Sequence, residues 1–264
     1  MGELIFIGLG LYDEKDISVK GKEVMEEADE VYSEFYTSHL AGTDFDKVQK
    51  ELDLDIKVLN RNQIESGAVP LKSALEKKIV FLTAGDPMAA TTHVDLRLRA
   101  IDKGISTRIV HSSSIFSAAP SILGVQHYKF GKTVTLPFYF DKENYPESPY
   151  WGIKNNIDIG LHTLILLDIN GEEKKFMTVN EGMEALLYLE EKHSKGVITD
   201  DTVIAGLARV GSANPELKAG NPKDIIDYDF GSGLQCMVVF GDLHFMEVDS
   251  LLAFADAPKH IGEE

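Results

Sequence analysis

Apolar runs and amphipathic polar segments alternate regularly over roughly the first 111 residues of the chain. Each apolar run has the length and the β-branched or aromatic content of a buried strand, and the segments between them carry apolar residues at helical spacing. This alternation predicts crossover connections and a mostly parallel sheet. The predicted strands lie at 3–10, 30–36, 56–59, 78–84 and 106–111, and the predicted helices lie at 16–30, at 45–52, after Pro70 and at 87–104.

The pattern changes after His111, where turn-rich stretches and isolated strong strands replace the regular alternation. Thr178 and Glu181 have the spacing of a capping box, which predicts a helix that continues to about Lys192. The remaining predicted elements are strands at 132–138, 162–169 and 202–210, helices at 114–124, 150–161 and within 221–230, a surface loop at 139–150, and a terminal hairpin of 234–241 with 243–248 through Gly241 and Asp242.

The two patterns predict an α/β protein of two domains, 1–111 with a mostly parallel sheet and 112–264 with a mixed sheet. A length of 264 residues suits one large or two modest domains, and a hydrophobic share of 44% is enough for a core. Every apolar run is shorter than the roughly 18 residues that a membrane span needs. The start MGELIFIGLG lacks a basic segment and a cleavage site, so we interpret it as a strand and expect a cytoplasmic protein.

The formal net charge is −17, from 43 acidic and 26 basic residues. This excess argues against a nucleic-acid backbone as the main partner. A basic protein partner or a cationic ligand is compatible with it, although acids that solvate the surface are the plainer explanation. The single cysteine, Cys236, excludes an intrachain disulfide and a cysteine zinc site, and we expect it to be a small buried hydrophobe. No metal is expected.

The stretch FLTAGDPMAATTH, residues 81–93, carries the most informative local chemistry. An aspartate followed by proline is typical of a helix start, so we expect Asp86 at the N-cap and Pro87 at the first helical position. Ala84 and Gly85 are small enough for a ligand to approach the main chain there. Ligands of open α/β sheets bind at the carboxyl ends of strands, so this loop is a candidate binding site.

The N-terminal GLGLYD, residues 8–13, does not complete a dinucleotide-binding motif. Asp13 stands where that motif needs its third glycine, and Leu11 and Tyr12 would crowd a pyrophosphate. A nicotinamide dehydrogenase is therefore disfavoured. A phosphate-binding lysine loop, a serine nucleophile elbow and a histidine zinc helix are missing from the sequence as well.

Several motifs together resemble the diphthine synthase family, a branch of the tetrapyrrole methylase superfamily. The combination of EFYTS (34–38) with GDPMAATTH (85–93) is the specific part, and the resemblance extends from residue 4 to about residue 256. The other matching segments are FIGLGLYDEKDISVKG (6–21), HSSSIFSA (111–118), YKFGKT (128–133), GLHTLILLDI (160–169), TDDTVIAGLARVGS (199–212) and AGNPKDII (219–226).

This resemblance implies a two-domain tetrapyrrole methylase-like fold with a cofactor cleft between the domains. It implies a methyltransferase that uses S-adenosylmethionine and acts on translation elongation factor 2. The implied acceptor is the amino group of a 3-amino-3-carboxypropyl-histidine, methylated up to three times to give diphthine in diphthamide biosynthesis. The resemblance also implies a homodimer, with no direct nucleic-acid or membrane partner.

The cofactor contacts of the family fall on matching motifs of this chain, and main-chain contacts among them explain the apolar residue types. Ala89 stands where relatives often carry valine, and Gln235 lies in a variable stretch. The implied cofactor-binding residues are Leu11, Asp86, Ala89, Ser114, Ile115, Leu167, Val210 and Gln235.

The reaction itself leaves several alternatives open. Methyl transfer from a sulfonium to an amine is an in-line displacement that needs alignment to roughly 3–3.5 Å and no covalent enzyme intermediate. An amine with a pKa of about 8 needs little help to lose its proton. If a base exists, the candidates are Asp13, His93 and Asp168, and no catalytic residue is assigned. A corrin-precursor methyltransferase and a non-catalytic binding module are the alternative functions.

Overall fold

The structure is a computed structural model, and it describes residues 2–34, 40–43, 45–66, 68–138, 144–170, 173 and 175–262. The chain divides into two compact units, one of residues 1–115 with 170–174 and one of residues 116–169 with 175–264. The predicted strand residues Phe35 and Tyr36 lie outside the described residues. Among the described helices, none has both the length and the apolar character needed to cross a bilayer.

The first unit is built on a five-stranded sheet in which every pair is parallel, in the order β3-β2-β4-β1-β5. This confirms the parallel sheet that the alternating sequence pattern predicts. Its elements are β1 (Glu3–Gly8), α1 (Val19–Glu26), β2 (Glu30–Glu34), α2 (Phe45–Leu52), β3 (Ile56–Leu59), α3 (Arg61–Ser66), α4 (Ala68–Ser73), β4 (Lys78–Thr83), α5 (His93–Asp102) and β5 (Ser106–Val110).

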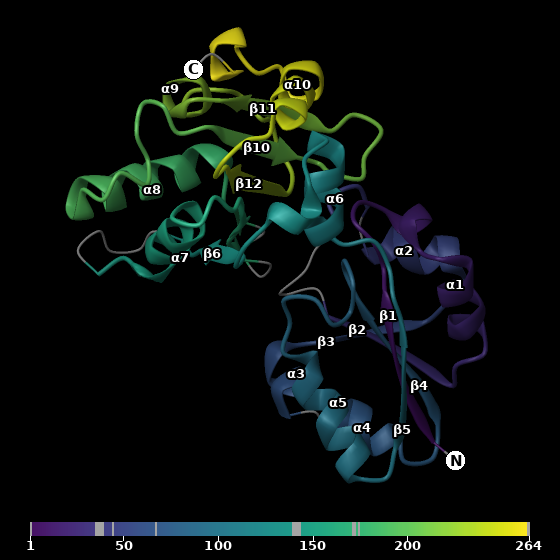
Figure 1. Cartoon of the computed structure of the whole chain (residues 1–264). Helices are drawn as coiled ribbons and strands as arrows, with labels where there is room; N and C mark the ends of the chain where they lie inside the picture. The colour runs from purple at the N-terminus through teal and green to yellow at the C-terminus, as the bar shows by residue number, and fades with distance from the viewer. Residues whose placement is uncertain are drawn as a thin grey trace. The chain divides into compact units, whose positions relative to one another are not determined.

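Helices cover both faces of this sheet, with α1 and α2 on one face and α3, α4 and α5 on the other (Figure 1). Alternate residues of the central strands supply the two faces because successive side chains of a strand point in opposite directions. Ile5 and Ile7 of β1 pack in the cluster that contains α1 and α2 residues, whereas Leu4 and Phe6 pack in the cluster of the other face. The central strands are therefore buried on both sides, as their continuous apolar runs require.

The predicted helix start at Asp86 and Pro87 is wrong, because α5 begins only at His93. The residues between form turns and bends, and Ala90 has a φ of 51°, in the left-handed region that interrupts a helix. Asp86 does not cap a helix, since its carboxylate accepts hydrogen bonds from a turn of its own loop and from the residues after β5. Tertiary contacts therefore override a local helix-start signal.

The second unit contains a mixed five-stranded sheet in the order β11-β10-β12-β7-β6, which confirms the mixed sheet predicted for the second half. Only the β6–β7 pair of this sheet is parallel. Its strands are β6 (Val134–Leu136), β7 (Thr163–Leu167), β10 (Ile204–Ala208), β11 (Glu216–Gly220) and β12 (Gln235–Val239), and its helices are α6 (Ile115–Leu123, whose first residue belongs to the first unit), α7 (Ser148–Ile157), α8 (Val179–His193), α9 (Pro222–Ile225) and α10 (Phe245–Phe254). A short ladder pairs β8 (Ile169–Asn170) with β9 (Lys175–Phe176), and 3-10 turns occur at Glu14–Asp16 (η1), His127–Lys129 (η2) and Lys259–Gly262 (η3).

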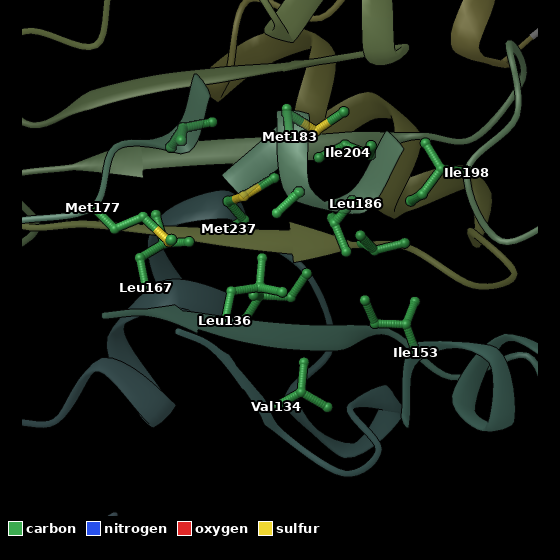
Figure 2. Packing of buried hydrophobic residues seen from close by; sticks show 14 of the residues in the cluster. Val134, Leu136, Ile153, Leu167, Met177, Met183, Leu186, Ile198, Ile204 and Met237 are labelled. Carbon is green, nitrogen blue, oxygen red and sulfur yellow. The ribbon is translucent and has the colours of Figure 1, made fainter. Parts of the chain in front are cut away.

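The core of the second unit lies between this sheet and helices α7, α8 and α9. Figure 2 shows side chains of β6, β7, β10 and β12 pointing towards those of α7 and α8, with Met237 opposite Met183. Gly182 of α8 permits this packing, because a Cβ there would lie 2.7 Å from the Met237 sulfur and 2.9 Å from Leu167. The capping box of Thr178 and Glu181 is confirmed at the start of α8.

The predicted terminal hairpin is wrong, because the second of its two strands is the start of α10. His244 and Glu247 form a capping box in which the imidazole accepts from the Met246 amide and the carboxylate accepts from the His244 amide. Histidine is not among the common N-cap residues, so the helix-start signal at this position is weak.

Glu247 has a second role, as the centre of a buried ionic network. Its carboxylate is fully buried and lies 2.5 Å from Lys129 Nζ and 3.2 Å from His162 Nε2. His162 accepts the Gly241 amide hydrogen at Nδ1, so its proton is on Nε2 and faces Glu247. Burial, as the largest effect, lowers the pKa of His162.

Burial by itself would raise the pKa of Glu247, but hydrogen bonds outweigh it and hold that pKa at about 2, well below the ordinary value of 4.5. The donors are Lys129, the backbone amides of Gln126 and His244, and His162. Because the folded pKa is depressed, the carboxylate stabilises the fold fully above pH 4.5 and loses this contribution as the pH falls towards 2.

We therefore expect Glu247→Gln to lower the free energy of unfolding at pH 7 by about 3 kcal/mol, since it leaves Lys129 without its buried partner. The variant is also expected to lose stability less steeply than the parent protein between pH 4.5 and 2. Urea denaturation across this range measures both effects. Glu184→Gln on the exposed face of α8 is the matched control. Equal acid sensitivity of Glu247→Gln and the parent would contradict the assignment.

Candidate functional site

The carboxyl ends of β1, β4 and β5 meet at one edge of the parallel sheet in the first unit. These three strands are adjacent and run in the same direction, ending at Gly8, Thr83 and Val110. The loops that follow them therefore begin side by side, which is the usual location of ligand sites in open α/β sheets. All five site residues predicted in this half of the sequence lie in those loops or directly after them.

The loops after β1 and β4 are joined through their main chains. Gly85 N donates to Gly10 O at 2.7 Å, and Gly10 N lies 3.4 Å from Gly85 O. Both glycines have positive φ, +84° at Gly10 and +70° at Gly85, which side chains disfavour. A Cβ on Gly85 would meet no described atom within 4 Å, so the main chain there is open to a close approach.

Asp86 connects the loop after β4 to the loop after β5. Its Oδ1 accepts from the Met88 amide at 3.1 Å, and its Oδ2 lies 2.7 Å from His111 Nδ1 and 3.4 Å from the Ser112 amide. The Asp86 side chain is 16% exposed and that of His111 is 71% exposed. A carboxylate has about four acceptor directions, and these contacts use three of them. Among the described residues, one direction therefore remains for a ligand.

The other predicted residues of the first unit are held by the same loops. Asp16 accepts from the Leu11 amide at 3.1 Å and from the Tyr12 amide at 2.6 Å, so the loop after β1 is closed by its own carboxylate. The Ala89 amide donates to Asp86 O at 3.2 Å. Ser114 and Ile115 stand at the start of α6 and are half-buried. The structure thus brings these predicted residues to one sheet edge.

The three predicted residues of the second unit also share one sheet edge. The antiparallel register pairs Ala208 with Gln235 and Leu166 with Cys236, so the end of β7, the end of β10 and the start of β12 coincide. Leu167 ends β7, Val210 follows β10, and Gln235 begins β12. Periodicity alone does not reveal this convergence, because it follows from the strand order.

The side chain of Leu167 faces the core of the second unit, and that of Gln235 forms hydrogen bonds within the same unit. Leu167 is 6% exposed and points into the core beside Met177 (Figure 2). Gln235 accepts from the Val179 amide at 2.8 Å and donates to Gly231 O at 2.8 Å, which fixes the start of α8. A ligand at this edge would therefore meet main-chain atoms of Leu167 rather than its side chain.

The three base candidates lie at different places, each with a hydrogen-bonding role of its own. Asp13 accepts from the Lys15 amide at 2.9 Å as the N-cap of η1. Asp168, in the second unit, accepts from the Phe138 and Ile169 amides, both at 2.9 Å. His93 is buried, with its Nε2 3.0 Å from Glu34 Oε1.

Glu34 is the polar residue of this region that sequence reasoning missed. It is the last residue of β2 and only 2% exposed, and it follows the buried residues Val31, Tyr32 and Ser33. A fully buried acid is unusual without a partner, and an acid at the end of a predicted buried strand is the signal that could have identified it. Its partner, His93, is the first residue of α5. This helix follows β4, which pairs with β2 in the sheet.

The prediction that Cys236 is a buried hydrophobe is confirmed. It is 4% exposed within β12, and burial raises the pKa of its thiol to about 12. Such a thiol is neither a nucleophile nor a metal ligand at neutral pH. Across the described part of the chain, no group of three or more histidine, cysteine, aspartate or glutamate side chains is arranged to hold a metal ion.

Comparisons with known proteins agree with this architecture. A family model described as Tetrapyrrole (Corrin/Porphyrin) Methylases matches residues 3–220. A diphthine synthase of Methanosphaera stadtmanae is 46% identical over 258 residues, which cover 98% of each chain. A diphthine synthase of Methanocaldococcus jannaschii is 49% identical over 252 residues, covering 94% of this chain and 97% of that protein. A crystal structure of diphthine synthase superposes with a TM-score of 0.88 at 37% identity, covering 98% of both chains.

The contacts of Asp86 give a local prediction. Asp86→Asn keeps one acceptor oxygen but replaces the other with an amide nitrogen, which cannot accept the Ser112 amide hydrogen. We expect a loss of about 1–2 kcal/mol in unfolding free energy and faster hydrogen exchange at the Met88 or Ser112 amide. Asp13→Asn, which alters a single exposed cap, is the control and should have a smaller effect. Unchanged exchange at both amides would refute this account of the loop.

Proposed function

This chain belongs to the diphthine synthases of the tetrapyrrole methylase family, and on that premise we propose that it methylates the modified histidine of translation elongation factor 2 with S-adenosylmethionine as donor. As a diphthine synthase it is a methyltransferase of diphthamide biosynthesis. The acceptor is the amino group of the 3-amino-3-carboxypropyl side chain, which receives up to three methyl groups. When bound, S-adenosylmethionine supplies the activated methyl group.

The observation that carries the donor site is the junction of the loops after β4 and β5 at Asp86, with the loop after β1 attached beside it through Gly10 and Gly85. The remaining acceptor direction of its carboxylate suits a donor's ammonium group or another cationic group. The open main chain at Gly85 allows a ligand to lie against the loop without a side chain between. We propose that Leu11, Asp86, Ala89, Ser114 and Ile115 hold the donor.

The residues of the second unit take part through their main chain in this proposal. The edge formed by Leu167, Val210 and Gln235 presents the ends of two strands and the start of a third. Leu167 is buried in the core and the Gln235 side chain is bonded within its own unit, so both are suited to fix the backbone against which an adenosine rests.

The proposed reaction depends more on alignment of the two reactants than on proton transfer by a protein side chain. Ordered loops can hold the amine in line with the methyl group, and such alignment contributes several kcal/mol. An α-amino group has an ordinary pKa of about 8, so its unprotonated form is already present at neutral pH and grows as the pH becomes mildly basic. We assign no catalytic base, since His93 is buried against Glu34 and the Asp168 carboxylate already accepts from two amides.

The proposed partners follow from this function. The substrate is a folded protein, so the site has to admit a protruding loop that carries the modified histidine. The net charge of −17 would steer basic patches of that substrate, and this effect would weaken as ionic strength rises. A homodimer and a cytoplasmic location, which the resemblance and the composition imply, remain proposals as well.

A corrin-precursor methyltransferase is the alternative because the family model covers such enzymes. The relatives at 46% and 49% identity are named diphthine synthase, which favours the protein substrate. A non-catalytic binding module is the other alternative, and it predicts no affinity for the methyl donor or its product.

The first test is transfer of methyl groups to elongation factor 2 that carries the unmethylated modified histidine. We expect the histidine peptide to gain mass in whole methylation steps, to at most three, when the chain and S-adenosylmethionine are present. Mass spectrometry reads the product, and a precorrin is offered in a parallel reaction. Methylation of the precorrin with none on the elongation factor would replace the proposed substrate.

The second test isolates the donor site. Calorimetry with S-adenosylhomocysteine should show one site per chain, and Asp86→Asn should weaken binding by roughly tenfold, as expected for the loss of one charge-assisted hydrogen bond. Glu184→Gln is the control on an exposed helix face. Full affinity in Asp86→Asn would remove Asp86 from the site, and no affinity in the parent protein would favour the binding module.

A further inference from the structure

The buried side chain of His93 is not explained by the proposed reaction. It is 1% exposed, and its ring lies against Phe81 and Phe6, with centroids 5.0 Å and 6.4 Å away. A histidine in such apolar surroundings needs a hydrogen-bond partner for each ring nitrogen, because an unpaired buried polar atom is destabilising.

Both ring nitrogens have partners, and the partners differ in kind. Nε2 lies 3.0 Å from Oε1 of Glu34, which is itself 2% exposed. Nδ1 lies 3.2 Å from the carbonyl oxygen of Pro87 and 3.4 Å from the hydroxyl of Thr83. A carbonyl oxygen only accepts, so the closer contact places a hydrogen on Nδ1.

A hydrogen on Nδ1 then requires another proton between Nε2 and Glu34. Without it, an unprotonated nitrogen would face a carboxylate oxygen at 3.0 Å, and neither could donate. The pair therefore holds either an imidazolium with a carboxylate or a neutral imidazole with a carboxylic acid. In both forms, His93 donates from Nδ1 to Pro87.

The Pro87 carbonyl belongs to the loop that carries Asp86 and Ala89. This loop lies outside the helix, because α5 begins only at His93, and the N-cap residue Thr92 makes no side-chain capping bond. His93 thus bonds back into the loop that precedes its own helix. An apolar pair of similar volume would fill this part of the core at least as well, but it would not direct a donor at Pro87.

We propose that Glu34 and His93 form a buried, doubly protonated positioning pair that fixes the Pro87 carbonyl and thereby the conformation of the Asp86–Ala89 loop. The link from this loop to methyl-donor binding rests on the proposed function. Neither residue touches the donor in this proposal, and the pair acts through the loop. Glu34 sets the orientation and protonation of the imidazole, and the imidazole holds the loop.

The protonation state is tested on the unmodified protein by nitrogen NMR with labelled histidine. His93→Asn, one of eight possible single-histidine changes, assigns the resonances. We expect Nδ1 of His93 to be protonated. An unprotonated Nδ1 with hydrogen only on Nε2 would mean that Nδ1 accepts from the Thr83 hydroxyl, and this would overturn the proposal. Thr83→Val, which removes that hydroxyl, should leave the signal of Nδ1 unchanged.

The positioning role is tested with a pair of Glu34 variants. Glu34→Gln can donate from its amide to Nε2 of a neutral imidazole, which keeps Nδ1 protonated and pointed at Pro87. Glu34→Leu fills similar volume but leaves Nε2 unpaired. In the ligand-free protein we expect faster hydrogen exchange at the Met88 and Ala89 amides in Glu34→Leu and near-parental exchange in Glu34→Gln. Equal exchange in Glu34→Leu and the parent would refute the proposal.

Donor affinity separates this inference from the proposed function. We expect Glu34→Leu to bind S-adenosylhomocysteine roughly tenfold more weakly than the parent, and Glu34→Gln to rescue binding to within about threefold. Measurements are made well below each variant's melting temperature, which is recorded alongside. Faster loop exchange with unchanged affinity would uphold the positioning pair and remove the loop from the donor site. A lower melting temperature with neither other change would reduce the pair to a structural role.

Discussion

The Asp86 carboxylate bonds three groups from two loops, and the arrangement of the candidate site in the first unit depends on it. The loops after β4 and β5 start from adjacent edges of the sheet, but their approach is set by the bonds to Met88, His111 and Ser112. Main-chain bonds between Gly10 and Gly85 attach the loop after β1 to the same assembly. Loss of this carboxylate would leave the loops after β4 and β5 without their common acceptor.

The sheet of the first unit was predictable because its strands are long, apolar and separated by amphipathic helices. The order of the strands in the sheet could not be predicted in this way, because hydrophobic periodicity does not indicate which parallel strands are neighbours. The helix start at Asp86 was mispredicted for a related reason. Aspartate before proline is a sound local signal, but the carboxylate finds its partners at His111 and Ser112, far along the chain. Local propensity and tertiary bonding compete for the same oxygen atoms.

The site shows the same division between local and tertiary information. The strand-end pattern at residues 81–93 predicts a ligand loop around Asp86, whereas the resemblance alone supplies Ser114 and the other predicted residues. The direction of each side chain was beyond both, so the inward orientation of Leu167 and the internal bonds of Gln235 emerge only from the fold. Glu34 escaped attention because its importance lies in its partner His93, which follows it in the chain only after two complete crossover connections.

Carboxylates that accept main-chain amides recur in both units, in loops that follow strands and near the end of helix α8. Asp16 binds the amides of Leu11 and Tyr12, Asp168 binds those of Phe138 and Ile169, and Glu190 binds those of Gly196, Val197 and Ile198. Part of the acid excess of this chain therefore orders loops rather than solvating the surface.

This use of acids fits a reaction that depends on alignment. A displacement between a sulfonium and an amine gains little from a resident nucleophile, but it is slowed by any freedom in the groups that hold the two reactants. Glycines with positive φ permit close approach at the cost of conformational entropy, and amide-binding carboxylates restore the lost order. The buried Glu34–His93 pair extends the same principle, because in our proposal it stabilises one carbonyl orientation in a loop that lies outside the helix.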